Sequence, residues 1–129
     1  MSGFTDYLED ALLKHVFTNT AYTSPSTVYA ALFTVAPSDT GGGTEVSGGA
    51  YARQSMAFSV SGTGTLATSS AAVEYPTATA DYGTVVAVGI FDASTSGNLL
   101  AYANLTANKT VSSGDVFRFN AGDVDITLT

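Results

Sequence analysis

The sequence predicts a mainly β protein, an antiparallel β-sandwich (jelly-roll-like) with one N-terminal α-helix. Three observations support this fold class. Two strand-like apolar runs are separated by only six residues, which is typical of a hairpin. Short strand patterns are separated by turn residues about every 8 to 12 positions, as in sandwiches. The one helical pattern lies near the N-terminus.

The chain is predicted to be a single domain, residues 1–129, which is a common size for one hydrophobic core. Aliphatic and aromatic residues make up 45% of it and charged residues only 12%. The charged share is about half of the usual value. So few charges give little electrostatic repulsion between copies, which favours self-association or a place in a larger assembly.

The composition excludes several functions. Four Lys and Arg residues against 11 acids give a net charge of -7, so the chain lacks the row of cations that nucleic-acid binding needs. There is no Cys, which excludes disulfides, thiolate nucleophiles and Cys-ligated metals. No apolar run reaches the roughly 18 residues of a membrane span, and the N-terminal segment carries Asp6, Glu9 and Asp10 where a secretory signal would start with Lys or Arg. We expect a soluble, leaderless protein that does not enter a membrane.

Residues 4–18 form the predicted helix. Thr5 can cap it, acids occupy its first turn, and Lys14 and His15 occupy its last turn, where the helix dipole favours each charge. One face carries apolar and aromatic side chains at three- and four-residue spacing, together with the only His: Phe4, Leu8, Ala11, Leu12, His15 and Val16. Because so short a helix is marginal alone, we expect this face to dock onto the sheet or onto a partner.

The β-sandwich is predicted over residues 27–129. A first strand at 27–35 and a central hairpin of 83–92 with 99–105 are apolar on both alternating faces, which predicts a sheet covered on both sides. Residues 50–60 alternate and predict a half-exposed strand. Shorter strands are expected at 65–70, 71–75, 110–111, 115–119 and 124–128.

Alternation also assigns side chains to faces. The expected faces of the first hairpin strand are Val85, Ala87, Gly89 and Phe91 against Val86, Val88 and Ile90. The expected faces of the last strand are Val124, Ile126 and Leu128 inside and Asp123, Asp125 and Thr127 outside. At about 1.5 Å per residue the helix spans roughly 20 Å, so a second sheet or a neighbouring subunit must cover the remaining apolar surface.

No motif predicts catalysis, a cofactor or a metal site, and we expect no enzyme activity. The glycine-rich loop 40–45 lacks the Lys and the following helix of a phosphate-binding loop. The turn 92–98 has the glycine of a calcium loop, but Ala103 stands where the bidentate Glu belongs, so a hairpin turn is the better interpretation. His15 has no Gly-x-Ser-x-Gly elbow to serve as a base, and a packed or helix-terminal role is favoured.

The loop 36–49 and the strand after it carry the candidate contact residues. The loop holds five of the 13 glycines and is long enough to favour a contact role. Tyr and Arg are enriched at protein contacts, although an ordinary exposed Arg is the alternative for Arg53. The residues predicted to contact other proteins are Asp39, Gly42, Glu45, Tyr51 and Arg53.

The chain also resembles a family of small virion proteins of tailed bacteriophages, usually labelled phage tail fibre protein. The segments that carry the resemblance in the first half are 20–23 (TAYT), 25–34 (PSTVYAALFT), 36–46 (APSDTGGGTEV) and 51–54 (YARQ). Those in the second half are 83–85 (GTV), 89–93 (GIFDA), 97–100 (GNLL) and 114–125 (GDVFRFNAGDVD). The resemblance spans nearly the whole chain.

The resemblance implies a non-enzymatic structural component of the virion, made in the host cytoplasm and present in many copies. We expect a tail or neck (collar) appendage that binds its own copies, as a homo-oligomer, and other virion proteins. Two structural alternatives stay open: a receptor-binding fibre adhesin that contacts a host-surface receptor, and a head decoration protein. The enzymatic alternative is a polysaccharide hydrolase of a tail spike.

Overall fold

The computed structural model describes residues 3–60 and 64–127, and its strands form three antiparallel sheets. The described part of the chain contains one helix, α1 (Asp6–Phe17). The large sheet has the order β1 (Gly3–Phe4), β9 (Leu99–Val111), β8 (Gly83–Phe91), β2 (Tyr29–Val35) and β3 (Thr44–Glu45), with β4 (Gln54–Ser55) also paired to β2. The mainly β prediction is confirmed.

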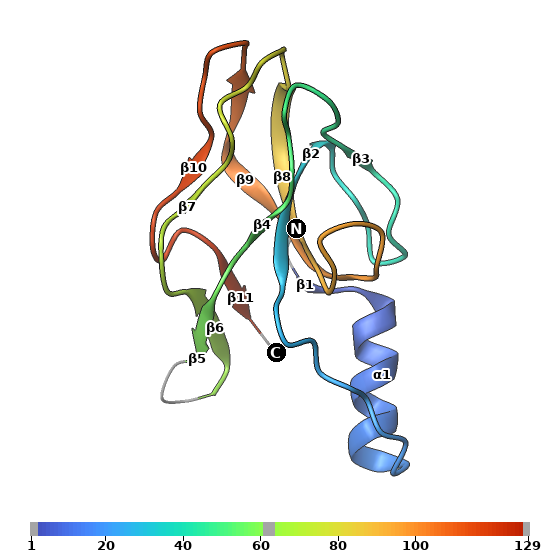
Figure 1. Ribbon diagram of the computed structural model, residues 1–129. Coiled ribbons are helices and arrows are strands. Elements are labelled where there is room, and N and C mark those ends of the chain that lie inside the picture. The colour runs from blue at the N-terminus through green and yellow to red at the C-terminus, as the bar shows by residue number, and fades with distance from the viewer. Residues whose placement is uncertain (1–2, 61–63, 128–129) are drawn as a thin grey trace.

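Two smaller sheets form a second layer. One pairs β7 (Val73–Glu74) with β10 (Arg118–Phe119), and the other has the order β11 (Asp125–Thr127), β6 (Leu66–Ser69) and β5 (Phe58–Val60). Figure 1 shows both beside the large sheet, and α1 projects from the end of the molecule that carries β5 and β6. The predicted sandwich with an N-terminal helix is therefore confirmed.

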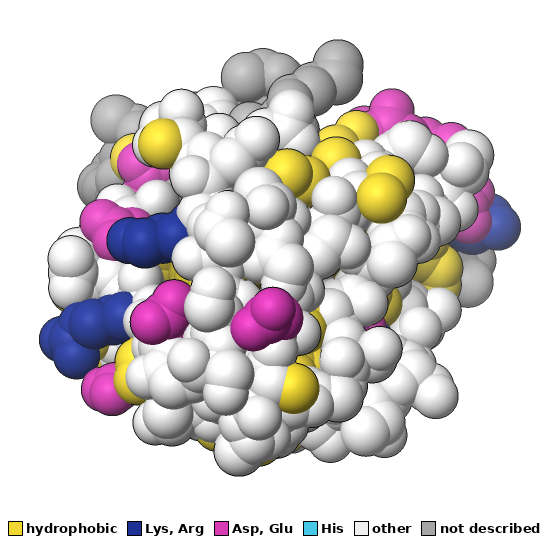
Figure 2. All heavy atoms as spheres, turned by 90° about the horizontal axis from the view of Figure 1, so that it is seen from above, with side chains coloured by type: hydrophobic (Ala, Val, Ile, Leu, Met, Phe, Trp, Pro, Cys, Tyr) yellow, Lys and Arg dark blue, Asp and Glu magenta, His cyan; other side chains and the backbone are white. Residues whose placement is uncertain are grey.

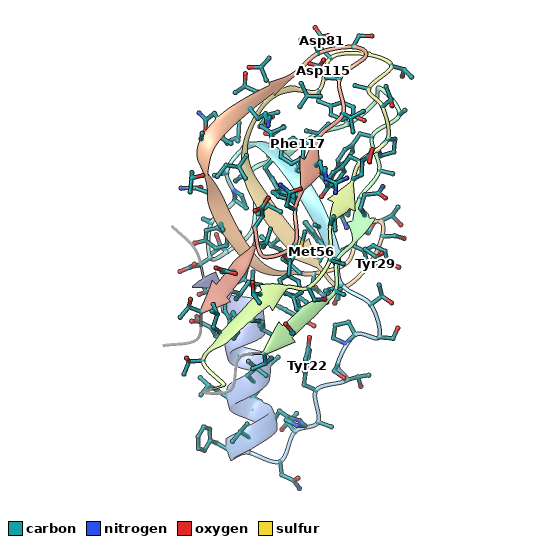
Figure 3. All side chains as sticks on the ribbon, turned by 90° about the vertical axis from the view of Figure 1, so that its left-hand side faces the viewer. Tyr22, Tyr29, Met56, Asp81, Asp115 and Phe117 are labelled. Carbon is teal, nitrogen blue, oxygen red and sulfur yellow. The ribbon has the colours of Figure 1, made fainter. Side chains whose placement is uncertain are left out.

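The main core lies between the two layers. Leu32 of β2 is fully buried there, and Met56 and Phe117, which Figure 3 places between the layers, are almost fully buried. Tyr75 is also buried, and its hydroxyl donates a hydrogen bond of 2.7 Å to the carbonyl oxygen of Ala30. The small sheets thus cover one face of the large sheet with side chains of the same chain.

The opposite face of the large sheet carries a smaller apolar cluster. Its buried members are Ala31, Phe33 and Ala87, with Val86 and Phe91 packed against them. The rings of Phe33 and Phe91 stack with their centres 6.2 Å apart. The guanidinium of Arg53 lies over Phe91. Covering these central strands on both faces therefore does not require a neighbouring subunit.

The hairpin β8–β9 is central, as predicted, because β8 pairs with β9 on one side and with β2 on the other. Its register shifts between Val85 and Ala87. Val85 consequently joins the main core with Val88, whereas Val86 and Ala87 belong to the opposite cluster. The predicted grouping of Val85 with Ala87, and of Val86 with Val88, is wrong because a bulge changes the alternation.

The strand predicted over residues 50–60 is instead two short strands, β4 and β5, in different layers. The N–H of Met56 donates to the carbonyl oxygen of Val28 at 3.0 Å, whereas Ala57 accepts from the N–H of Ser70 at 2.9 Å. The chain passes from the large sheet to the small one at this point. The alternation of apolar and polar side chains continues with the same period of two through this change of sheet. It therefore cannot reveal that the chain leaves one sheet and joins the other.

The remaining short strands lie where the sequence predicts them, but most of them are shorter than predicted. β6, β7, β10 and β11 lie within the segments predicted at 65–70, 71–75, 115–119 and 124–128, and residues 110–111 are the end of β9. Val124 is buried and Ile126 half-buried, while Asp123, Asp125 and Thr127 are exposed as predicted. Leu128 lies outside the described residues.

Helix α1 is shorter than predicted. It begins at Asp6, because Gly3–Phe4 pairs with β9 as a strand and the side chain of Thr5 caps the helix. The first part of the predicted apolar face is half-buried, but His15 and Val16 are exposed. The last turn of the helix therefore does not pack on the sheet, and docking of this turn onto a partner stays a prediction.

Candidate contact surfaces

Three of the five predicted contact residues form one cluster. Arg53 donates through Nε and Nη2 to the two carboxylate oxygens of Glu45, at 2.9 and 2.8 Å. The hydroxyl of Tyr51 donates to Oε2 of the same carboxylate at 2.7 Å. The side chains of Arg53 and Glu45 are 9% and 25% exposed, so this ion pair is largely shielded from water.

The Tyr51 hydroxyl also completes the hydrogen bonding along the edge of β2. Strand β3 pairs with one end of that edge and β4 with the other. Between them, the N–H of Leu32 donates to the Tyr51 hydroxyl at 3.0 Å, and its carbonyl oxygen accepts from the N–H of Val46 at 2.9 Å. The loop between β3 and β4 therefore protects an edge whose free backbone groups would otherwise attract another strand.

Arg53 ties this loop to the turn of the central hairpin. Its Nη1 donates to the carbonyl oxygens of Ala93 and Ser96, at 3.0 and 2.8 Å. Every nitrogen of the guanidinium thus has a partner within the chain. The planar, forked guanidinium is suited to such combined stacking and bidentate bonding, which an ammonium group cannot reproduce.

The pKa directions in the cluster follow from these contacts. Burial acts to raise the pKa of Glu45, but the hydrogen bonds from Arg53 and Tyr51 and the charge of Arg53 outweigh it, so that pKa lies below its ordinary value. The hydrogen bond to Glu45 raises the pKa of Arg53 despite burial. Burial, and then the hydrogen bond to Glu45, raises the pKa of Tyr51. All three groups therefore keep their usual charge at neutral pH, as a structural tie requires.

The other two predicted contact residues lie apart from this cluster. Asp39 is exposed, accepts a hydrogen bond of 2.6 Å from the Tyr102 hydroxyl, and through its carbonyl oxygen accepts one from the N–H of Asp6. The bond to Asp39, followed by burial, raises the pKa of Tyr102. Gly42 is exposed at a φ of +78°. The loop thus presents Asp39 and Gly42 outward, while the cluster fixes its shape.

Asp92 of the hairpin turn and His15 at the end of the helix both make hydrogen bonds within the chain. The carboxylate of Asp92 accepts from the N–H and the side-chain amide of Asn98, at 2.7 and 3.0 Å, which closes the predicted hairpin turn. Nδ1 of His15 accepts from the N–H of Tyr22 at 3.1 Å. Within residues 3–60 and 64–127, no three His, Cys, Asp or Glu side chains converge as a metal site would require.

An apolar groove of about 310 Å³ lies between the start of α1 and the sheet of β5, β6 and β11. The large apolar side chains in its wall include Phe4, Leu8, Phe58, Val60, Leu66 and Ile126. No charged side chain lines it. The sequence gives no sign of this groove, because it forms only where segments distant in the chain pack together.

Helix α1 ends in an exposed apolar tip, formed by Leu13, Val16 and Phe17, which are 59%, 65% and 78% exposed. Figure 1 shows this half of the helix projecting beyond the strands. Of these three residues, only Val16 belongs to the apolar face that the sequence predicts for docking. Leu13 and Phe17 are four residues apart and lie on a different side of the helix, where no strand covers them.

The end of the molecule opposite α1 has a different surface. Figure 2 shows it covered mostly by uncharged polar side chains and backbone, with Lys and Arg near its margin and with Asp and Glu both at the margin and toward the middle. Asp81 and Asp115 lie at this end (Figure 3). The apolar groove and the apolar tip are therefore features of the other end. Among the described residues, no helix has the length and apolarity needed to cross a membrane.

Comparison with known families gives one result that covers nearly the entire chain. The family described as Podophage GP4 fiber I protein gp80 matches residues 3–127. No curated protein matches the chain. The family match confirms the resemblance to a phage tail fibre protein, and it implies that the protein is part of the virion and associates with other virion proteins. The chain therefore belongs to the Podophage GP4 fiber I protein gp80 family.

Proposed function

We propose that this protein is a non-enzymatic structural component of a phage fibre, present in many copies as a tail or neck (collar) appendage. It is made in the host cytoplasm and assembles through contacts with its own copies and with other virion proteins. The observation that carries the proposal is the family match over residues 3–127. The structure supports it, since the most chemically suggestive side chains bond to one another and large apolar side chains stand exposed.

Two surfaces serve this assembly. The loop 36–49 offers Asp39 and Gly42 for contact with a virion protein, and the cluster of Glu45, Tyr51 and Arg53 holds that loop in a fixed shape. The apolar tip of α1 provides the second surface. A preformed loop binds with a smaller loss of conformational entropy than one that must be ordered on contact.

Labelling of the protein in intact particles tests its location. Label on fibres at the tail or neck is the expected result, whereas label spread over the capsid would identify a head decoration protein. Purified protein that adsorbs to host cells and blocks infection would identify an adhesin. Release of reducing ends from host capsule or lipopolysaccharide would contradict a purely structural role.

Light scattering of the purified protein over a range of concentrations tests self-assembly. A mass that is a multiple of 13.1 kDa is expected. A monodisperse monomer at high concentration would contradict assembly through its own copies, while attachment to another virion protein would survive that result.

A further inference from the structure

We propose that the apolar groove of one copy receives the apolar tip of α1 from a second copy, and that two copies exchange their tips about a two-fold axis. This inference rests on the proposed self-assembly and names its surface. Both halves of the contact are present in one chain: a projecting tip of Leu13, Val16 and Phe17, and a hollow lined by apolar side chains.

Charge favours these two surfaces over the rest of the molecule. Acids outnumber cations 11 to 4 in every copy, so a contact between copies is most favourable where it uses uncharged regions. No charged side chain lines the groove. On the helix, Asp6 and Glu9 lie in the first turn, away from the tip, and Asp10 pairs with Lys14 at 2.9 Å. The tip can therefore enter the groove without burying an unpaired charge, which would be costly.

The position of the groove identifies a second copy as the source of the tip. Leu8 of α1 forms part of the groove wall, whereas Phe17 lies nine residues further along the same helix. At a rise of about 1.5 Å per residue, Phe17 stands roughly 13 Å beyond Leu8 along the axis. A chain cannot place its own tip in its own groove without breaking α1.

A two-fold axis between the two copies allows each tip to enter the groove of the other copy at the same time. Because the tip and the groove lie at the same end of the molecule, two copies that meet at this end can each supply what the other lacks. Their helices run antiparallel in this arrangement. The acidic first turn of one helix then approaches Lys14 in the last turn of the other, which is electrostatically favourable.

The buried area also requires a reciprocal contact. The three tip side chains together expose on the order of 300 Å² of apolar surface. One tip in one groove buries an area no larger than that of a crystal-packing contact. The reciprocal exchange doubles the buried area, which brings it closer to the size of a specific interface.

Disulfide trapping tests the contact directly, since the chain has no Cys of its own. Thr18→Cys carries the thiol directly beside the tip and leaves Leu13, Val16 and Phe17 in place, and Ala67→Cys carries it on the groove wall in β6. The two variants, mixed in equal amounts and oxidised, should form a disulfide-linked dimer at least ten times faster than a control pair. The control pairs Thr18→Cys with Ala80→Cys, an exposed position beside Asp81 at the opposite end of the molecule.

Light scattering separates failure of this inference from failure of the proposed function. The wild-type protein should have twice the mass of 13.1 kDa, and Phe17→Ser should be a monomer with an unchanged circular dichroism spectrum, because Phe17 lies outside the core. Val116→Ser, at another exposed apolar position, should remain a dimer. An oligomer that persists in Phe17→Ser and is not trapped by the thiol pair overturns the tip-in-groove contact and leaves self-assembly intact. A wild-type monomer at every concentration overturns both.

Discussion

The guanidinium carbon of Arg53 lies 3.7 Å from the centre of the Phe91 ring. This contact joins the chain just before β4 to the end of β8, and hydrogen bonds from the same side chain reach Glu45 and the hairpin turn. A cation over an aromatic face contributes about 1–2 kcal/mol when the pair is shielded from water. Arg53 therefore holds three separate segments of one chain together.

Replacing Arg53 should cost far more stability than replacing an exposed Arg. Arg53→Gln leaves the carboxylate of Glu45 half-buried without its cation, and we expect the free energy of unfolding to fall by about 3 kcal/mol. Arg118→Gln is the matched control, because Arg118 and Glu74 are more than half exposed and 3.7 Å apart. It should lose less than about 1 kcal/mol. Urea unfolding of both variants measures the difference, and equal losses would show that Arg53 is not a tie.

A related substitution tests Arg53 as a contact residue. Arg53→Glu places a second acid beside Glu45 in a shielded site, so we expect it to unfold more readily than Arg53→Gln. If Arg53→Glu folds normally and still enters particles, Arg53 contributes neither to the cluster nor to an interface. Particle incorporation is measured by immunoblot of purified virions from complemented infections.

The Glu45 carboxylate should make stability depend on acid pH. Its pKa in the folded chain lies below the ordinary value of 4.5, so the unfolded chain takes up a proton first as pH falls. The stabilisation is fully present above about pH 4.5 and is lost as pH falls through the lower folded pKa. Thermal melts at several pH values between about 3 and 6 should show a shallower acid decline in Glu45→Gln than in wild type. If the melting temperatures of wild type and Glu45→Gln fall equally as the pH is lowered, the pKa of Glu45 does not differ between the folded and unfolded chains.

The sequence predicts the sandwich because its signals are local. Apolar runs on either side of a short turn determine the hairpin, and the capping Thr5 and the charges of the terminal turns indicate α1. The predicted face of Val85 is wrong because nearly every residue of this strand is apolar, so the sequence pattern does not reveal the bulge. The single strand predicted at 50–60 is wrong because the chain changes layer there without a change in the alternation of its side chains.

The predicted contact residues show a different limit. Tyr and Arg beside a glycine-rich loop are typical of an interface, but the same residue types suit an internal tie equally well. The partners of Arg53 at Ala93 and Ser96 are 40 and 43 residues away in sequence, so only the fold reveals the internal tie, and the contact role of Arg53 stays a prediction. An amphipathic helix is expected to have one apolar face, and Leu13 and Phe17 lie on the other side of α1. The helical pattern therefore does not predict that they form an exposed apolar tip.

The Tyr51 hydroxyl should stabilise the folded protein through its hydrogen bond at the edge of β2. Tyr51→Phe removes the acceptor for the N–H of Leu32 and the donor to Glu45. We expect the free energy of unfolding to fall by about 1–3 kcal/mol, the usual cost of leaving a buried polar group unsatisfied. Tyr7→Phe, on the exposed side of α1, is the control and should change it by less than about 0.5 kcal/mol. Hydrogen exchange should also accelerate at Leu32 in Tyr51→Phe and not in Tyr7→Phe.

Two neighbouring glycines should differ sharply in their tolerance of a methyl group. Gly42 and Gly43 both have positive φ values, +78° and +73°, so an Ala at either position is strained by about 1–2 kcal/mol. A Cβ on Gly42 would meet nothing within 4 Å, whereas one on Gly43 would lie 2.6 Å from the carbonyl oxygen of Val35 and 2.8 Å from the nitrogen of Pro37.

Gly43→Ala should therefore destabilise the protein by clearly more than Gly42→Ala, because backbone on both sides of the close contact would have to move. Chemical unfolding of the two variants measures this difference. Since Gly42→Ala adds one methyl group to the exposed surface and keeps the loop near its native shape, it also serves as a test of the loop as a contact. Reduced incorporation into particles at near-native stability would place Gly42 at an interface, and unchanged incorporation would remove it from the contact surface.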